Sequence, residues 1–95
     1  MPQMMSKDLE KLLKTHQNLI QSDFKKVVSH VQRENDGWIL NTIMLEGYDV
    51  PFQYKRQKRY KNLTGQRVNL TYYPAQQQVA GFEMEIMKVV RVKVS

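Results

Sequence analysis

Apolar and polar residues alternate along most of this chain, and turn residues interrupt the alternation at intervals. From about residue 24 onward, runs such as residues 68–72 carry an apolar side chain at every second position. This pattern is typical of half-buried β-strands. A length of 95 residues suits one domain, because two separate units would each approach the size at which disulfides or metals are normally required. We therefore expect one mainly β domain.

The turn residues set the limits of the expected strands. Asp36-Gly37 lies between two apolar runs and is a strong signal for a two-residue hairpin turn. In the last run, Lys88 falls in the apolar register, which predicts a bulge or a crossover at residues 87–89. Phe52 and Tyr72 share a face with valines or leucines and are expected in the core. The expected strands cover residues 24–33, 38–46, 50–55, 66–73 and 82–94, and residues 74–81 are expected to form a glutamine-rich loop.

The first 22 residues follow a different period. Between residues 6 and 21 the apolar side chains recur at spacings of three and four, which places them on one stripe of an amphipathic helix. A helix boundary is expected near Ser22. The leucines and isoleucine of this stripe are Leu9, Leu12, Leu13, Leu19 and Ile20. The predicted fold class is thus α+β and mainly β, with a helix in residues 1–22 followed by a five-stranded antiparallel barrel in residues 23–95.

Positive charge is concentrated in one segment. The chain has 15 Lys and Arg against nine Asp and Glu, a net charge of +6, yet the 33 residues between Asp49 and Glu83 contain no acid. A field of this kind matches phosphate groups through Coulomb attraction and counterion release. A solvated loop is the alternative interpretation. The basic residues of the segment are Lys55, Arg56, Lys58, Arg59, Lys61 and Arg67.

Aromatic residues lie within and beside the acid-free segment. An exposed ring can stack on a nucleic-acid base, and the candidates are Tyr60, Tyr73 and Trp38. The alternative for each ring is ordinary packing within the barrel, with a phenol oxygen at the surface. Tyr54 shares a face with Phe52 and is a weaker stacking candidate for that reason.

Few residues are suited to catalysis. The chain has no Cys, which excludes a disulfide, a thiol nucleophile and a Cys-ligated metal. Its two histidines, His16 and His30, fall in separate expected elements, and Glu83 and Glu85 are most simply the solvated face of a strand. We expect no enzyme, no cofactor and no metal. Without an apolar leader or a long apolar run, we also expect a cytoplasmic protein with no membrane partner.

The strand pattern resembles the OB-fold, a small, partly open five-stranded barrel. The stretch KVVSHVQREND-GWILNTIMLEG-YDVPFQYK resembles the opening three-strand meander of that family. LTGQRVNL resembles its entry into the fourth strand and AGFEMEIMKVVRV its closing strand. An SH3-like barrel is the alternative. The resemblance implies an oligonucleotide lying across the second and third strands, residues 38–55, between the connections at 33–37 and 74–81.

Two functions follow as expectations. The first is non-catalytic binding of single-stranded RNA or DNA, in which the six basic residues contact phosphates and the three exposed rings stack on bases. The second is a protein-interaction module or accessory subunit, in which the apolar helix stripe docks on a partner or on a second copy.

Overall fold

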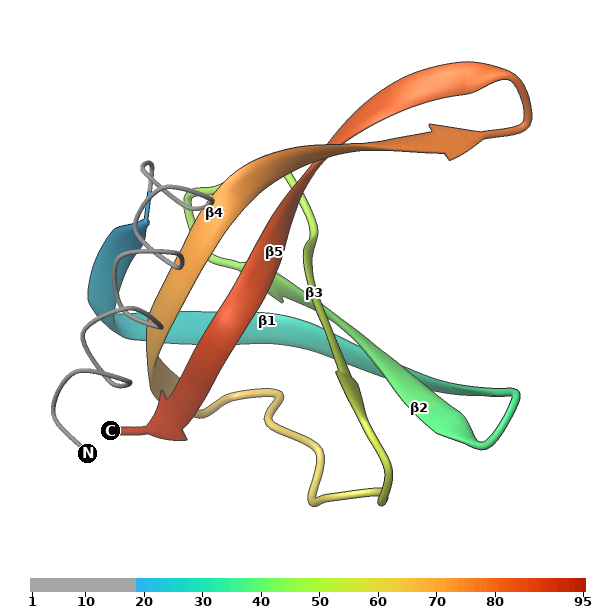
Figure 1. Ribbon diagram of the computed structural model, residues 1–95. Coiled ribbons are helices and arrows are strands. Elements are labelled where there is room, and N and C mark those ends of the chain that lie inside the picture. The colour runs from blue at the N-terminus through green and yellow to red at the C-terminus, as the bar shows by residue number, and fades with distance from the viewer. Residues whose placement is uncertain (1–18) are drawn as a thin grey trace, which may run out of the picture.

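Five strands joined into a closed ring form the described part of the chain (Figure 1). The computed structural model describes residues 19–95, so residues 1–18 of the helix expected within residues 1–22 lie outside the described residues. The ring order is β1-β2-β3-β5-β4, and β1 pairs with both β2 and β4. This mainly β arrangement is compatible with a small barrel. The strands are β1 (Ile20–Asn35), β2 (Trp38–Leu45), β3 (Phe52–Arg56), β4 (Arg67–Val79) and β5 (Phe82–Val94).

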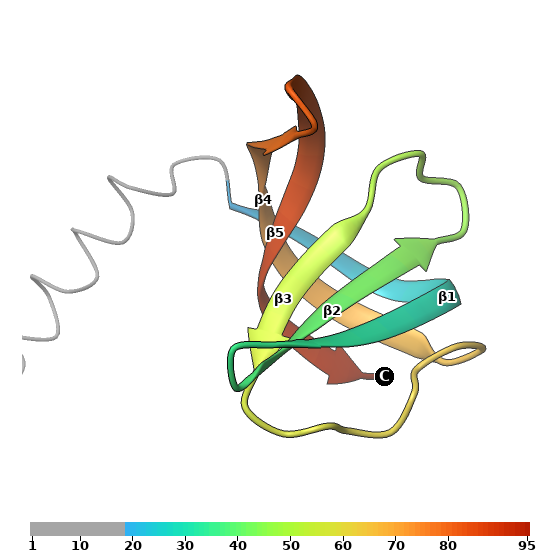
Figure 2. The ribbon, with the colours of Figure 1, turned by 90° about the vertical axis from the view of Figure 1, so that its right-hand side faces the viewer.

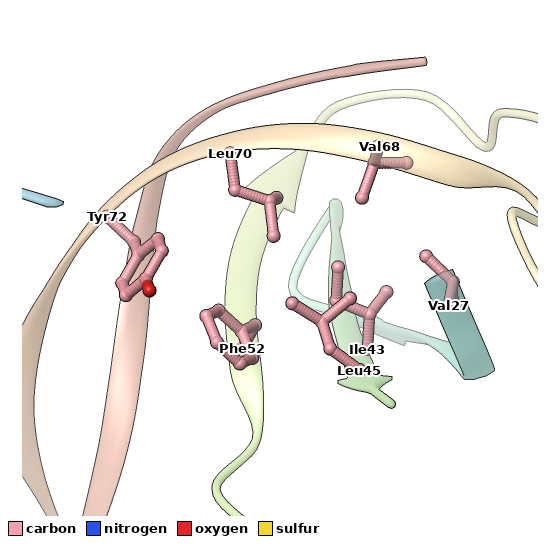
Figure 3. Packing of buried hydrophobic residues seen from close by; sticks show 7 residues of the cluster. All are labelled: Val27, Ile43, Leu45, Phe52, Val68, Leu70 and Tyr72. Atoms are coloured by element: carbon pink, nitrogen blue, oxygen red, sulfur yellow. The ribbon is translucent and has the colours of Figure 1, made fainter. Parts of the chain in front are cut away.

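The core is built from the inward-facing positions of four strands, as Figure 3 shows. Burial alternates along β2, and Val68, Leu70 and Tyr72 do the same along β4. Phe52 is fully buried, and its ring meets that of Tyr72 edge to face with the centroids 4.8 Å apart. The expected core positions of Phe52 and Tyr72 are confirmed. The cluster comprises Val27, Ile43, Leu45, Phe52, Val68, Leu70 and Tyr72.

The expected boundary between helix and strand at Ser22 is wrong. β1 begins at Ile20, where Ile20 and Gln21 pair with residues of β4. The Ser22 hydroxyl also lies 2.8 Å from the Tyr72 hydroxyl. Pairing with β4 gives these backbone groups hydrogen-bond partners, and this tertiary effect outweighs the local helical spacing. The pairing of β1 with β4 changes register just after these residues, between Ser22 and Lys25.

The expected loop at 74–81 is also wrong, because β4 continues to Val79. Beyond Tyr72, β4 pairs with β5 alone, and a proline such as Pro74 is tolerated in a strand with a free edge. Ala80 and Gly81 make the turn with φ values of 51° and 84°, the signature of a two-residue hairpin turn. The expected turn at Asp36-Gly37 is confirmed, with φ values of 53° and 80°.

β5 pairs with β4 along one edge and with β3 along the other. The pairing with β3 is parallel, so the prediction of an antiparallel barrel is wrong for this pair of strands. Met87 and Lys88 pair in parallel with β3, whereas the whole of β5 pairs antiparallel with β4. The ladder with β4 shifts between the Thr71 and Tyr72 pairs, which leaves Val90 as the extra residue. Of the two irregularities predicted near residues 87–89, a bulge or a crossover, the structure shows a bulge, with the extra residue at Val90.

Candidate functional site

Two surface hollows lie beside β3. The first, of about 550 Å³, is formed by β2, β3, β4 and β5 together with the end of β1. The second, of about 360 Å³, is formed by β2, β3, the end of β5 and the connection at residues 57–66. We call the first the upper hollow and the second the lower hollow, because β3 runs from top to bottom in Figure 1.

The space between β3 and β5 results from the way these two strands pair. β3 and β5 pair only through Phe52–Met87 and Gln53–Lys88. After these two pairs, residues 54–56 of β3 pair with β2 alone, and residues 89–94 of β5 pair with β4 alone. Since no backbone ladder closes this part of the ring, side chains line an open groove between the two strands.

Tyr54 connects the hollows, because it lines both. Its ring centroid lies 5.3 Å from the Arg56 guanidinium carbon and 6.4 Å from the centroid of the His30 ring. Burial raises the pKa of the Tyr54 phenol above its ordinary value, and the positive charge of Arg56 opposes this shift in part. The upper and lower hollows therefore adjoin at the Tyr54 ring on β3.

Both hollows are lined by positively charged side chains and by no acidic side chain. The upper hollow includes Lys55 and Lys88, and the lower hollow includes Arg56 and Lys61, whereas no Asp or Glu lines either one. Amide side chains complete the upper hollow and can donate or accept hydrogen bonds. They belong to Asn35, Gln53, Gln76 and Gln77.

The structure brings together five of the nine expected site residues. Lys55 and Tyr73 line the upper hollow, and Arg56, Tyr60 and Lys61 line the lower one. Tyr60 is 63% exposed and Tyr73 is half-buried. Four of these residues lie close together in the sequence, at the end of β3 and in the connection after it, and the fold adds Tyr73 of β4 beside Lys55.

The other four expected residues line neither hollow. Lys58 and Arg59 are exposed in the connection that borders the lower hollow. Trp38 is 44% exposed at the start of β2. Arg67 lies where β1 and β4 pair, with its guanidinium carbon 4.8 Å from the centroid of the Phe24 ring.

The basic connection is held against β1 by hydrogen bonds. His30 Nδ1 accepts the backbone N–H of Leu63 at 2.9 Å, and the Asn62 amide donates to the His30 carbonyl at 2.9 Å. Gln32 Nε2 donates to the Tyr60 carbonyl at 2.9 Å. Since Nδ1 accepts, His30 Nε2 carries the proton and donates to Asn41 Oδ1 at 2.8 Å. His30 thus positions the segment that carries the basic residues.

Three contributors to the groove are not among the nine expected site residues. Tyr54 was a weaker stacking candidate because it shares a face with Phe52, yet the sheet opens beside it. Gln53 carried no local signal. Lys88 did carry one, because it broke the apolar alternation, and the structure places it at the parallel pair with β3.

Residues 19–95 contain no group of three or more His, Cys, Asp or Glu that could hold a metal ion. Within the same range no helix is long and apolar enough to cross a membrane. No protein-family model, curated protein or solved structure matches the chain.

Proposed function

We propose that this protein binds single-stranded nucleic acid, without catalysing a reaction, along the groove formed by the two hollows. The observation that carries the proposal is the lining of the groove. It contains the four cations Lys55, Lys88, Arg56 and Lys61 and no acid. Cations that follow an open groove neutralise successive phosphates and release their counterions.

Aromatic rings favour a single strand over a duplex as the ligand. Tyr54, Tyr60 and Tyr73 line the groove, and unpaired bases can stack on such rings with a gain of about 1–3 kcal/mol per base. In a duplex the base faces are already stacked on one another. The amides of Gln53, Gln76 and Gln77 add hydrogen bonds to base edges or phosphates.

We further propose that the fold is an OB-fold. The resemblance implies binding across the second and third strands between two flanking connections. The upper hollow is lined by Leu40 of β2 and Gln53 of β3, and also by Asn35 and Gln76, which lie within residues 33–37 and 74–81. This location supports the proposal. The concentration of charge at the lower hollow extends the path toward residues 57–61.

Charge reversal in the connection tests the location of the site. A variant with Lys58, Arg59 and Lys61 changed to Glu should bind a fluorescent single-stranded oligonucleotide at least tenfold more weakly than the parent, because Lys61 lines the lower hollow and Lys58 and Arg59 are exposed in the connection that borders it. Fluorescence anisotropy at fixed salt measures this. The binding of single-stranded RNA and DNA is compared in the same series.

A control variant changes the net charge by the same amount at exposed positions outside the groove, namely Lys26, Arg91 and Lys93 to Glu. Its affinity should fall much less than that of the connection variant. Equal losses in the two variants would mean that net charge, rather than this groove, governs binding, and the proposed site would be wrong.

A further inference from the structure

The β4–β5 hairpin stands away from the ring as a two-stranded ribbon (Figures 1 and 2). β1 pairs with β4 only as far as Tyr72, and β3 reaches β5 only at Met87 and Lys88. The outer edges of residues 74–79 and 82–86 therefore have no strand partner in the part of the chain that the structure describes.

The ribbon has one apolar and one acidic face. Residues directly opposite each other in an antiparallel pair project to the same face. Val79 lies opposite Phe82, and Gln77 lies opposite Met84. These apolar side chains are 44%, 72% and 47% exposed for Val79, Phe82 and Met84. The other face carries Glu83 and Glu85, opposite Gln78 and Gln76.

A two-stranded ribbon is marginally stable alone and gains stability when its apolar face is covered. The net charge of this ribbon indicates what covers its apolar face. Residues 74–87 contain Glu83 and Glu85 and no Lys, Arg or His, a charge of −2. The net charge of +6 then leaves +8 on the rest of the chain. Two such hairpins repel each other, whereas a hairpin and the basic body of another copy attract.

The lower hollow has the chemistry that complements the hairpin tip. It combines the apolar side chains of Leu63, Val92 and Val94 with the cations Arg56 and Lys61. The hairpin cannot reach the lower hollow of its own chain, because the tip and the connection at residues 57–66 lie at opposite ends of the molecule in both views (Figures 1 and 2).

We propose that the β4–β5 hairpin docks into the lower hollow of a second copy of this chain. The tip enters end-on, so that its two faces meet different walls of the hollow: Phe82 packs against the apolar side chains, and Glu83, on the other face of the tip, approaches Arg56 and Lys61. The interface joins two different surfaces, so a pair of copies still has one free hairpin and one free hollow, and the assembly continues as a chain or closes as a ring. This self-association goes beyond nucleic-acid binding and does not depend on it.

Sedimentation velocity of the full chain, in low salt and without nucleic acid, tests the proposal. The parent should show a mass above the monomer value of 11.3 kDa that rises with protein concentration and falls with added salt. A tip variant, Phe82→Ser, and a hollow variant, Lys61→Glu, should each be monomeric alone. Lys93→Glu, which has the same charge change on β5 outside the lining of either hollow, should associate like the parent.

Mixing the two monomeric variants gives the decisive result. The tip variant keeps an intact hollow and the hollow variant keeps an intact hairpin, so an equimolar mixture should form a dimer and nothing larger. A monomeric parent, a monomeric mixture, or a hollow variant that still associates would overturn the proposal. Circular dichroism checks that each variant is folded, and Arg56→Glu replaces Lys61→Glu if that variant is not.

Discussion

Tyr54 shows how one residue can serve both the sheet and its surface. It follows the buried Phe52 by two positions on β3, so its side chain starts on the inward face. The ladder between β3 and β5 ends at Gln53, and the Tyr54 ring therefore borders open space on both sides of the groove. Burial raises its pKa, and the nearby Arg56 guanidinium moderates the shift.

The raised pKa of Tyr54 predicts a pH dependence. The folded chain keeps this phenol protonated above the ordinary tyrosine pKa of about 10, while the unfolded chain releases the proton there. Its contribution to stability is complete below that pH and is lost as the pH rises through the folded value. The tyrosinate absorbance of the parent minus that of Tyr54→Phe should thus titrate with a midpoint above about 10. A midpoint at or below 10 would contradict the described burial.

The connection at residues 57–66 shows that an element without regular structure can still be fixed in place. Its local sequence indicated a polar, basic loop and nothing more. The hydrogen bonds from Leu63 and Asn62 to His30, and from Gln32 to Tyr60, hold it against β1. These partners are about 30 residues apart in the sequence, so no local pattern could predict them.

Replacing His30 by Phe should loosen this connection. The substitution keeps a ring but leaves the Leu63 N–H and Asn41 Oδ1 without the partner that His30 provides. We expect a loss of about 1–3 kcal/mol in the free energy of unfolding, together with faster hydrogen exchange at the Leu63 amide. Val31→Thr, at a neighbouring exposed position on β1, is the control and should change neither. Unchanged exchange in His30→Phe would show that His30 does not hold the connection.

The elements also show the limits of local reasoning. Alternation and turn residues predicted β2 and the Asp36-Gly37 turn, because both depend on neighbouring residues. The extension of β4 through Pro74 to Val79 was missed because its glutamines resemble a loop and its only partner is β5. The parallel contact of β3 with β5 could not be predicted either, since it depends on closure of the ring.

On the scale of the whole molecule, charge is distributed unevenly over the ring. The acid-free segment between Asp49 and Glu83 contains the six basic residues expected at the site. In the folded chain Lys55 lines the upper hollow with Lys88, which lies outside that segment, Arg56 and Lys61 line the lower hollow, and Arg67 lies beside Phe24. The kinds of residue at the candidate site were therefore predictable, whereas its membership depended on the tertiary structure.

The salt dependence of binding to a single-stranded oligonucleotide tests the central claim most directly. If the four groove cations each neutralise one phosphate, a plot of log affinity against log salt concentration should have a slope of about −3. Duplex DNA in the same series should bind more weakly, because its bases are not free to stack. A slope close to zero, or no binding of a single strand at low salt, would contradict the account.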